Sequence, residues 1–293
     1  MFFLRILLVH ACYSDINDSL DNCSDAKVFD YDKTDFYCYL AKEDFTASEP
    51  NVVIQLPSGD IEVKDTDCAN SSPDPLLNNT SLDGKTLHIK GTGSTNLILK
   101  SSFTMKSTAS KLVLENLILK SEVQLTQKLI ESQELWLKNI EFRELNTSSI
   151  LVSSKGSLKL KGVRFTGISS NENLLELGQG QDLQISELEI SDSTFLALIQ
   201  TEHSDVSLST VTVTNSSVKE LLLSIKEAKS SVSLSTIKLS FGNQKEDCSG
   251  LIQIEETPSS TVSINSLEIE GSPCEKQSNV RSPVLDIKYV GSV

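Results

Sequence analysis

The sequence has few aromatic and few basic residues and no long apolar run. Aromatic residues make up 5% of the 293 residues, and Trp136 is the single tryptophan. Lys and Arg number 26 against 40 Asp and Glu, which gives a net charge of −14. Nucleic-acid surfaces need clustered basic residues, so we expect no nucleic-acid partner. No later stretch approaches the about 20 apolar residues of a membrane helix, so we expect no membrane-spanning segment.

Histidine is scarce as well, which excludes several kinds of catalytic centre. The chain contains His10, His88 and His203 alone. His88 falls at an outward strand position and His203 in a turn, so we predict surface histidines rather than ligands or bases. No Ser-His-Asp or Cys-His pair has a suitable spacing. We therefore predict no catalytic residue, no metal site and no cofactor.

The N-terminus predicts export. Residues 1–14 place one arginine in a short apolar run followed by small residues, as in a secretory signal peptide. Cleavage before Cys12 with lipid anchoring is the alternative. Residues 15–50 form an acidic segment with cysteines that lacks the glycine and terminal glutamate of a calcium-binding EF-hand, so we expect a solvated cap. Residues 51–293 form the body of a secreted or surface-exposed protein.

Cysteines and glycosylation sequons agree with export. The cysteines gather toward the two ends of the chain, where disulfides would hold incompletely stacked coils. We predict a Cys248–Cys274 disulfide between loops of adjacent coils and a Cys23–Cys38 disulfide, with Cys68 unpaired or bridged elsewhere. Asn-x-Ser/Thr sequons fit a glycoprotein. They occur at Asn17, Asn22, Asn70, Asn78, Asn79, Asn146 and Asn215.

An internal repeat carries the fold prediction. The pattern apolar-x-apolar-x-x-apolar-x-apolar recurs at spacings of 23, 23, 25, 23, 26 and 30 residues, which indicates a solenoid. Its copies start at Leu112, Leu135, Leu158, Leu183, Val206, Val232 and Val262.

Each copy predicts two short strands that meet at a corner, because the alternation skips one position. Asn116, Asn139 and Gly162 stand at that corner and tolerate a left-handed backbone. A second apolar segment follows each copy, such as Ile150–Val152 or Leu174–Leu177, and supplies a third strand. Leucine-rich repeats place their asparagine later, and a β-sandwich would show hairpin turns, so a parallel β-helix is favoured over both.

Two segments near the start resemble the pectin-lyase-like superfamily of right-handed β-helices. Val52–Val63 resembles its first strand, Pro-x-Gly turn and second strand, and Leu87–Ser94 its next coil. The resemblance spans roughly residues 50 to 290 and implies the full fold: an all-β, right-handed parallel β-helix of about eight three-strand coils with an N-terminal cap segment.

Enzymes of that superfamily act on acidic polysaccharides through acidic and basic residues on one strand column. In this chain Glu176 and Asp286 would stand four coils apart, roughly 19 Å at 4.8 Å per strand, whereas paired glycosidase carboxyls lie about 5 to 9.5 Å apart. The superfamily's catalytic signatures are missing. The outward residues of the column would be Leu151, Glu176, Ser224, Gln253 and Asp286.

The functional prediction is a non-catalytic extracellular module for structure, adhesion or recognition, with carbohydrate or a protein surface as partner. Trp136, beside Val113 and near Ile118, is the best candidate for an exposed binding patch; coverage by a loop or by the N-terminal segment is the alternative. A polysaccharide lyase or glycoside hydrolase remains the alternative function. The last coil is open, so we expect either a longer protein or end-to-end self-association.

Overall fold

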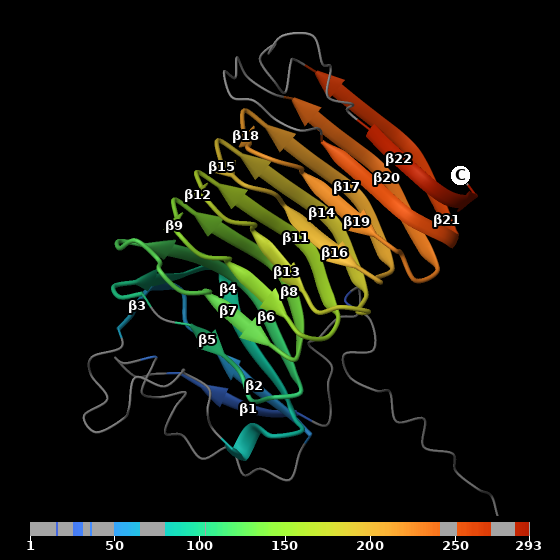
Figure 1. Cartoon of the computed structure of the whole chain (residues 1–293). Coiled ribbons are helices and arrows are strands. Elements are labelled where there is room, and N and C mark those ends of the chain that lie inside the picture. The colour runs from blue at the N-terminus through green and yellow to red at the C-terminus, as the bar shows by residue number, and fades with distance from the viewer. Residues whose placement is uncertain are drawn as a thin grey trace, which may run out of the picture.

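The seven copies of the repeat lie side by side as neighbouring strands of one parallel sheet. In the computed structural model Leu112 pairs with Leu135, Leu135 with Leu158, and this register continues through every copy to Val262. The chain forms an all-β parallel β-solenoid of about seven turns, close to the eight predicted (Figure 1). The structure describes residues 16, 26–31, 36, 50–64, 80–102, 104–240, 251–270 and 285–292.

Long strands that bend in the middle form the largest sheet. Their inward positions are apolar on both sides of the bend, so each strand covers the core with both arms. They are β4 (Thr86–Leu99), β6 (Lys111–Ser121), β8 (Glu134–Arg143), β11 (Leu158–Thr166), β14 (Leu183–Ser191), β17 (Val206–Thr214), β20 (Ser231–Ser240) and the second half of β21 (Ile252–Glu270).

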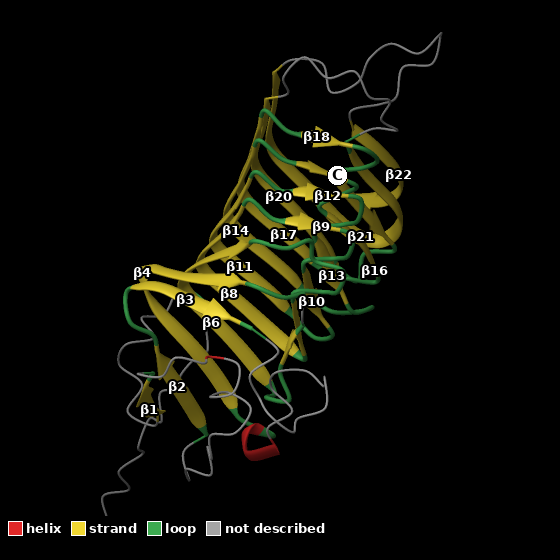
Figure 2. Cartoon of the chain, turned by 90° about the vertical axis from the view of Figure 1, so that its left-hand side faces the viewer, coloured by secondary structure: helices red, strands yellow, loops and turns green. Residues whose placement is uncertain are grey.

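Two columns of shorter strands close each turn (Figure 2). A two-residue column that the sequence did not predict contains β9 (Asn146–Thr147), β12 (Ser169–Ser170), β15 (Thr194–Phe195) and β18 (Ser217–Val218). The third column corresponds to the second apolar segments and contains β5 (Met105–Lys106), β7 (Ile130–Ser132), β10 (Val152–Ser154), β13 (Leu175–Leu177), β16 (Ile199–Glu202), β19 (Leu223–Lys226), the first half of β21 and β22 (Leu285–Ser292).

The N-terminal coils follow the same stacking rule. The strands β1 (Ala26–Asp30) and β2 (Asn51–Gln55) extend the pre-corner arm of the sheet, and β3 (Gly59–Val63) extends the post-corner arm. A 3-10 turn, η2 (Thr80–Leu82), precedes β4. The predicted signal peptide and most of the predicted cap lie outside the described residues.

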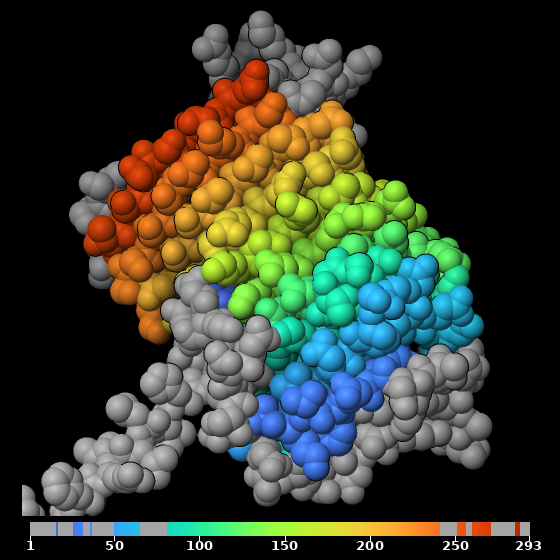
Figure 3. Space-filling view, turned by 180° about the vertical axis from the view of Figure 1, so that it is seen from behind, coloured from blue at the N-terminus to red at the C-terminus, as the bar shows by residue number. Residues whose placement is uncertain are grey.

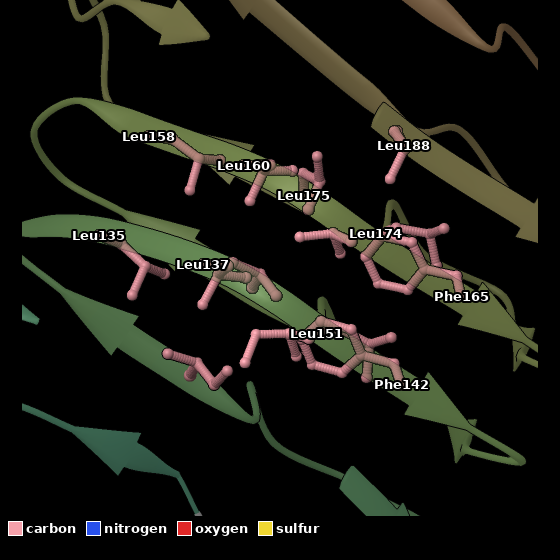
Figure 4. Close-up of a cluster of buried hydrophobic side chains, with 14 of the residues drawn as sticks. Leu135, Leu137, Phe142, Leu151, Leu158, Leu160, Phe165, Leu174, Leu175 and Leu188 are labelled. Atoms are coloured by element: carbon pink, nitrogen blue, oxygen red, sulfur yellow. The ribbon is translucent and has the colours of Figure 1, made fainter. Parts of the chain in front are cut away.

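The core runs along the whole stack and is built of equivalent side chains from successive turns. Leucines from β8 and β11 face leucines of the third column, and the rings of Phe142 and Phe165 stack with centroids 4.8 Å apart and planes 9° apart (Figure 4). Such stacking of like on like means that each turn buries its apolar face against its two neighbours.

Left-handed residues recur at three corners along the stack. The predicted corner in the long strands is confirmed, with φ of 56° at Asn116, 52° at Asn139 and 63° at Gly162. Glu187 and Thr210 take the same conformation in the next turns, although neither is a residue type that favours it. A second corner contains Glu144, Gly167, Asp192 and Asn215, and a third contains Gly180, His203 and Glu227.

Candidate binding surface

A trough of about 660 Å³ follows the first corner across six long strands, from β4 to β17. Figure 3 views the molecule from the side on which these strands lie. Five steps at about 4.8 Å per strand make the trough roughly 24 Å long, and its long axis crosses the strands. We call it the corner trough. It is lined by Gly93, Asn116, Leu117, Ile118, Asn139, Ile140, Glu141, Gly162, Arg164, Glu187, Leu188, Glu189, Thr210 and Thr212.

An asparagine ladder runs along the corner. The Asn139 Nδ2 donates to Asn116 Oδ1 at 2.9 Å, so the two amides are fixed side by side. The next position along is Gly162, where a Cβ would lie 2.6 Å from Asn139 Oδ1. Glycine therefore serves two purposes there: it accepts φ of 63° and leaves room for the neighbouring amide.

Charged side chains line the arm beyond the corner. The outward residues of successive turns form one column, in which Ile118, Glu141, Arg164, Glu189 and Thr212 pair in that order. Arg164 Nε lies 3.1 Å from Glu189 Oε2. Glu141 accepts two hydrogen bonds from Arg143, at 2.6 and 2.7 Å. Both carboxylates of the column are thus paired with guanidinium groups.

The expectation that Trp136 and Val113 are exposed is wrong. Trp136 is 1% and Val113 0% exposed. Lys111 Nζ lies 4.0 Å and Lys159 Nζ 4.6 Å from the indole centroid, and the indole nitrogen donates to Glu134 Oε1 at 2.8 Å. The indole cannot stack on a sugar in this arrangement.

Ile118 belongs to a different part of the surface from Trp136. It is half-buried and lies beyond the corner, on the wall of the corner trough. The structure therefore separates the three residues of the predicted patch. Two of them stabilise the outer face of the sheet, and one borders the trough.

His88 is buried, contrary to the prediction of a surface histidine. It does lie at an outward strand position, between Val53 and Val113 in the sheet, but it is 1% exposed. Its Nε2 lies 3.1 Å from Glu115 Oε2, and Lys138 Nζ lies 3.5 Å from the other oxygen. Strand alternation gives the direction of a side chain but not what covers it, so the sequence held no signal for this burial.

The environment shifts both titratable groups of this pair. Burial lowers the pKa of His88 below its ordinary value, and its contact with Glu115 opposes this only in part. Burial alone would raise the pKa of Glu115, but His88, Lys138 and Lys90 outweigh it and hold that pKa below the usual range. Glu115 is therefore an ionised group, and His88 is neutral at pH 7.

The third column confirms most of the predicted outward residues. Ser224, Gln253 and Asp286 pair in register, and Glu176 pairs with Ser153. Leu151 is a correction, because it is buried in the core and Ser153 takes the outward position. The prediction counted this strand two residues too early, since its apolar segment starts before the strand does.

Glu176 is engaged in a local cluster. It accepts a hydrogen bond from Ser153 Oγ at 2.6 Å and another from Lys128 Nζ. Burial raises the pKa of Glu176, but Lys128 and Ser153 outweigh this and lower it. A carboxylate with a lowered pKa is a poor general acid or base at neutral pH.

The structure describes two of the remaining predicted site residues, Asn146 and Asn215. Asn146 is exposed on β9, and Asn215 is exposed at the second corner, where its Nδ2 donates to Asp192 Oδ1 at 2.5 Å. Asn70, Asn79, Cys23, Cys38, Cys248 and Cys274 lie outside the described residues. Within the described residues no group of three or more His, Cys, Asp or Glu side chains could hold a metal ion.

Comparison with protein-family models, with curated proteins and with solved structures finds no match. In the described part of the chain no helix is long and apolar enough to cross a membrane.

Proposed function

We propose that this protein is a non-catalytic recognition module, secreted or displayed on a cell surface, that binds a linear carbohydrate along the corner trough. The observation that carries the proposal is the trough itself. Its volume of about 660 Å³ falls in the range of small-ligand sites, and its long axis follows the stack, which suits a polymer lying across the strands.

The lining has the chemistry that sugar hydroxyls need. Asn139 and Thr212 offer both donors and acceptors, Arg164 offers donors, and Glu187 offers acceptors. A sugar hydroxyl both donates and accepts, so alternating partners along the trough suit a chain of sugars better than a lone ion. The rigid solenoid fixes these groups at repeated intervals, which reduces the entropy lost on binding.

The contacts of the carboxylates in the trough favour binding over turnover. Glu141 and Glu189 each contact an arginine, and they stand two turns apart with Arg164 between them. Both carboxylates are engaged by a guanidinium group, so neither is free to contact a glycosidic oxygen or a water as a glycosidase acid or base does. We therefore retain the lyase or hydrolase alternative only as an outcome of the test.

The proposal also covers the handedness of the helix, export, disulfides and glycosylation. We propose a right-handed β-helix of the pectin-lyase-like type, on the strength of the segments Val52–Val63 and Leu87–Ser94. Export, with Cys248–Cys274 and Cys23–Cys38 disulfides, follows from the N-terminus and the cysteine positions. The exposure of Asn146 and Asn215 is compatible with glycans at both sites.

The test is a glycan-array assay with two matched variants. Arg164→Ala and Lys238→Ala each remove one exposed ion pair between neighbouring turns, with Glu189 and Glu268 respectively. Exposed pairs contribute about 0 to 1 kcal/mol, so both variants should fold like the wild type. Only Arg164 lines the corner trough, so only Arg164→Ala should lose glycan binding.

A parallel screen for lyase and hydrolase activity completes the test. Binding that is lost in Arg164→Ala but kept in Lys238→Ala, without turnover of any polysaccharide, supports the proposal. Equal binding by both variants would exclude the corner trough as the site. Release of sugar fragments would overturn the non-catalytic assignment.

A further inference from the structure

The charged side chains of the corner trough are mainly acidic. Its lining contains three glutamates, Glu141, Glu187 and Glu189, against one arginine, Arg164, which leaves a formal charge of −2. The recognition of carboxylate, sulfate or phosphate groups on a ligand uses arginine or lysine donors. The trough supplies such a donor once and contains no lysine.

Two of the three carboxylates are already paired within the protein. Arg164 Nε lies 3.1 Å from Glu189 Oε2. Arg143, which stands outside the lining, donates two hydrogen bonds to Glu141. The single basic residue of the trough therefore already balances a carboxylate of the protein, and a bound anion would compete with Glu189 for it.

Glu187 is the carboxylate of the trough that stays unpaired. It is exposed and stands at the corner, with φ of 57°. Its neighbours along the corner are Gly162, which has no side chain, and Thr210, which carries no charge. In the described part of the chain the Glu187 carboxylate forms no ion pair and accepts no hydrogen bond. An uncompensated negative charge therefore lines the trough.

The lysines of the same turns lie on the other arm of the long strands. Lys111 and Lys159 lie over the indole ring of Trp136, and their strands reach the corner only beyond these residues. Lys138 lies 3.5 Å from Glu115. None of these lysines lines the trough, so they supply no donors to an anion bound there.

An uncharged sugar chain fits these contacts better than an acidic one. Sugar hydroxyls donate short, charge-assisted hydrogen bonds to carboxylates, so Glu187 can accept from a neutral sugar. A carboxylate or sulfate on the ligand has no proton to donate and repels Glu187 at close range. One side chain therefore attracts one class of polysaccharide and repels the other.

We propose that the corner trough selects polysaccharides without anionic groups and that Glu187 excludes chains bearing carboxylate or sulfate. This inference rests on the proposed carbohydrate binding and adds the class of ligand to it. The ligand class is opposite in charge to the acidic polysaccharides on which enzymes of the pectin-lyase-like superfamily act.

A glycan array with matched pairs tests the inference on the full chain. Each acidic polymer, such as polygalacturonate or hyaluronate, is printed beside its carboxyl-reduced form, which keeps the linkages but has no charge. Neutral polymers and sulfated polymers complete the array. Wild-type protein should bind neutral forms about fivefold more tightly than anionic forms, as expected for one exposed charge pair. In about 1 M NaCl the difference should shrink, because salt screens charges beyond about 3 Å.

Glu187→Gln and Glu144→Gln are the matched variants. Both glutamates are exposed and left-handed, with φ of 57° and 54°, but Glu144 stands at the second corner, outside the lining of the trough. Glu187→Gln should lower the ratio of neutral to anionic binding about threefold to fivefold. Glu144→Gln should leave that ratio unchanged.

The outcomes distinguish this inference from the function on which it rests. Tightest binding to an anionic polymer, abolished in Arg164→Ala, would overturn the inference and leave the proposed function standing. The same ratio of neutral to anionic binding in wild type and Glu187→Gln would exclude Glu187 as the selecting residue. Binding to no polymer at all would overturn the proposed function and the inference with it.

Discussion

Trp136 shows how a single side chain can be judged wrongly from its strand position. The alternation places it outward, and outward means exposed for most residues of a solenoid. Here two lysine side chains lie on the ring and Glu134 accepts the indole hydrogen bond. Lysine stems cover apolar surface while their charges remain near water, so a basic neighbourhood can bury an aromatic ring.

We predict that Trp136→Ala destabilises the protein by about 3 to 5 kcal/mol, as truncation of a buried aromatic residue usually does. Urea unfolding followed by circular dichroism measures the change, with Trp136→Phe as the milder control. Because Trp136 is the single tryptophan, wild-type fluorescence should be blue-shifted and poorly quenched by acrylamide. Wild-type stability in Trp136→Ala, or strong quenching, would contradict the burial.

His88 predicts a dependence of stability on pH. Burial lowers its pKa in the folded protein below the value of about 6.5 that it has when unfolded. As the pH is lowered, His88 therefore takes up a proton at a higher pH in the unfolded chain than in the folded chain. The contribution of His88 to the free energy of unfolding is therefore fully present above about pH 6.5. It declines as the pH falls below that value toward the pKa of His88 in the folded protein.

The measurement is the melting temperature between pH 8 and pH 5.5, a window above the titration of Glu115. The wild type should lose stability across the window, and His88→Gln should lose less. His203→Gln is the matched control, because His203 is 53% exposed, and it should keep the wild-type slope. Equal slopes for His88→Gln and the wild type would exclude His88 as the cause.

At the level of elements, hydroxyl side chains hold the turns together. Ser193 Oγ accepts the Ile168 N–H at 3.0 Å and donates to the Ser191 carbonyl at 2.7 Å. One turn later Ser216 Oγ accepts the Ser193 N–H at 3.1 Å. Both serines are buried, so these bonds satisfy backbone groups that water cannot reach.

We predict that Ser193→Ala costs about 1 to 3 kcal/mol, because it leaves the buried Ile168 N–H without an acceptor. Ser207→Ala is the control: this serine is exposed on β17, and its loss should change stability by no more than about 0.5 kcal/mol. The melting temperatures of both variants, compared with that of the wild type, test this prediction. Similar melting temperatures would show that the hydroxyl of Ser193 contributes nothing.

The sequence predicted the elements better than their surroundings. Apolar alternation with one skipped position located every long strand from Leu112 onward, because that pattern is a direct consequence of two strand arms meeting at a corner. The corner residues Asn116, Asn139 and Gly162 followed from backbone sterics alone. The turn serines went unpredicted, since serine is common throughout the chain and its hydrogen bonds depend on the neighbouring turn.

The binding surface was the least predictable part. The corner residues Asn116, Asn139 and Gly162 were predicted for their backbone conformation, and nothing in the sequence indicated that they border a trough. The trough arises from the bend at the corner, which sets the two arms of each strand at an angle. A single copy of the repeat predicts its own corner, but the trough needs the corners of six neighbouring strands stacked in register.

At the scale of the whole molecule, charge is unevenly distributed along the stack. Residues 85–165 contain thirteen Lys and Arg against six Asp and Glu, although the whole chain is strongly acidic. The basic middle turns include Lys111, Lys138 and Lys159 on the outer face of the long strands.

A solenoid also predicts which large changes the molecule tolerates. Each turn contacts only its neighbours, so removal of one whole turn should leave equivalent surfaces facing each other. Deleting residues 183–205 joins Asp182 to Val206. In the intact chain Val206 follows Asp205, so the residue before this strand remains an aspartate. Val163 then faces Val211 and Phe165 faces Val213, which keeps the core apolar.

We predict that this 23-residue deletion folds, with strand-type circular dichroism and a melting temperature lower by a few degrees, since one interface between turns is lost. Deleting residues 183–194 instead removes about half a turn and places inward residues outward, so that variant should aggregate or remain unfolded. Gel filtration and circular dichroism distinguish the two. If the whole-turn deletion behaved like the half-turn deletion, stability would depend on contacts beyond neighbouring turns. If it folds but loses glycan binding, the missing Glu187 and Glu189 would mark the part of the corner trough that the ligand requires.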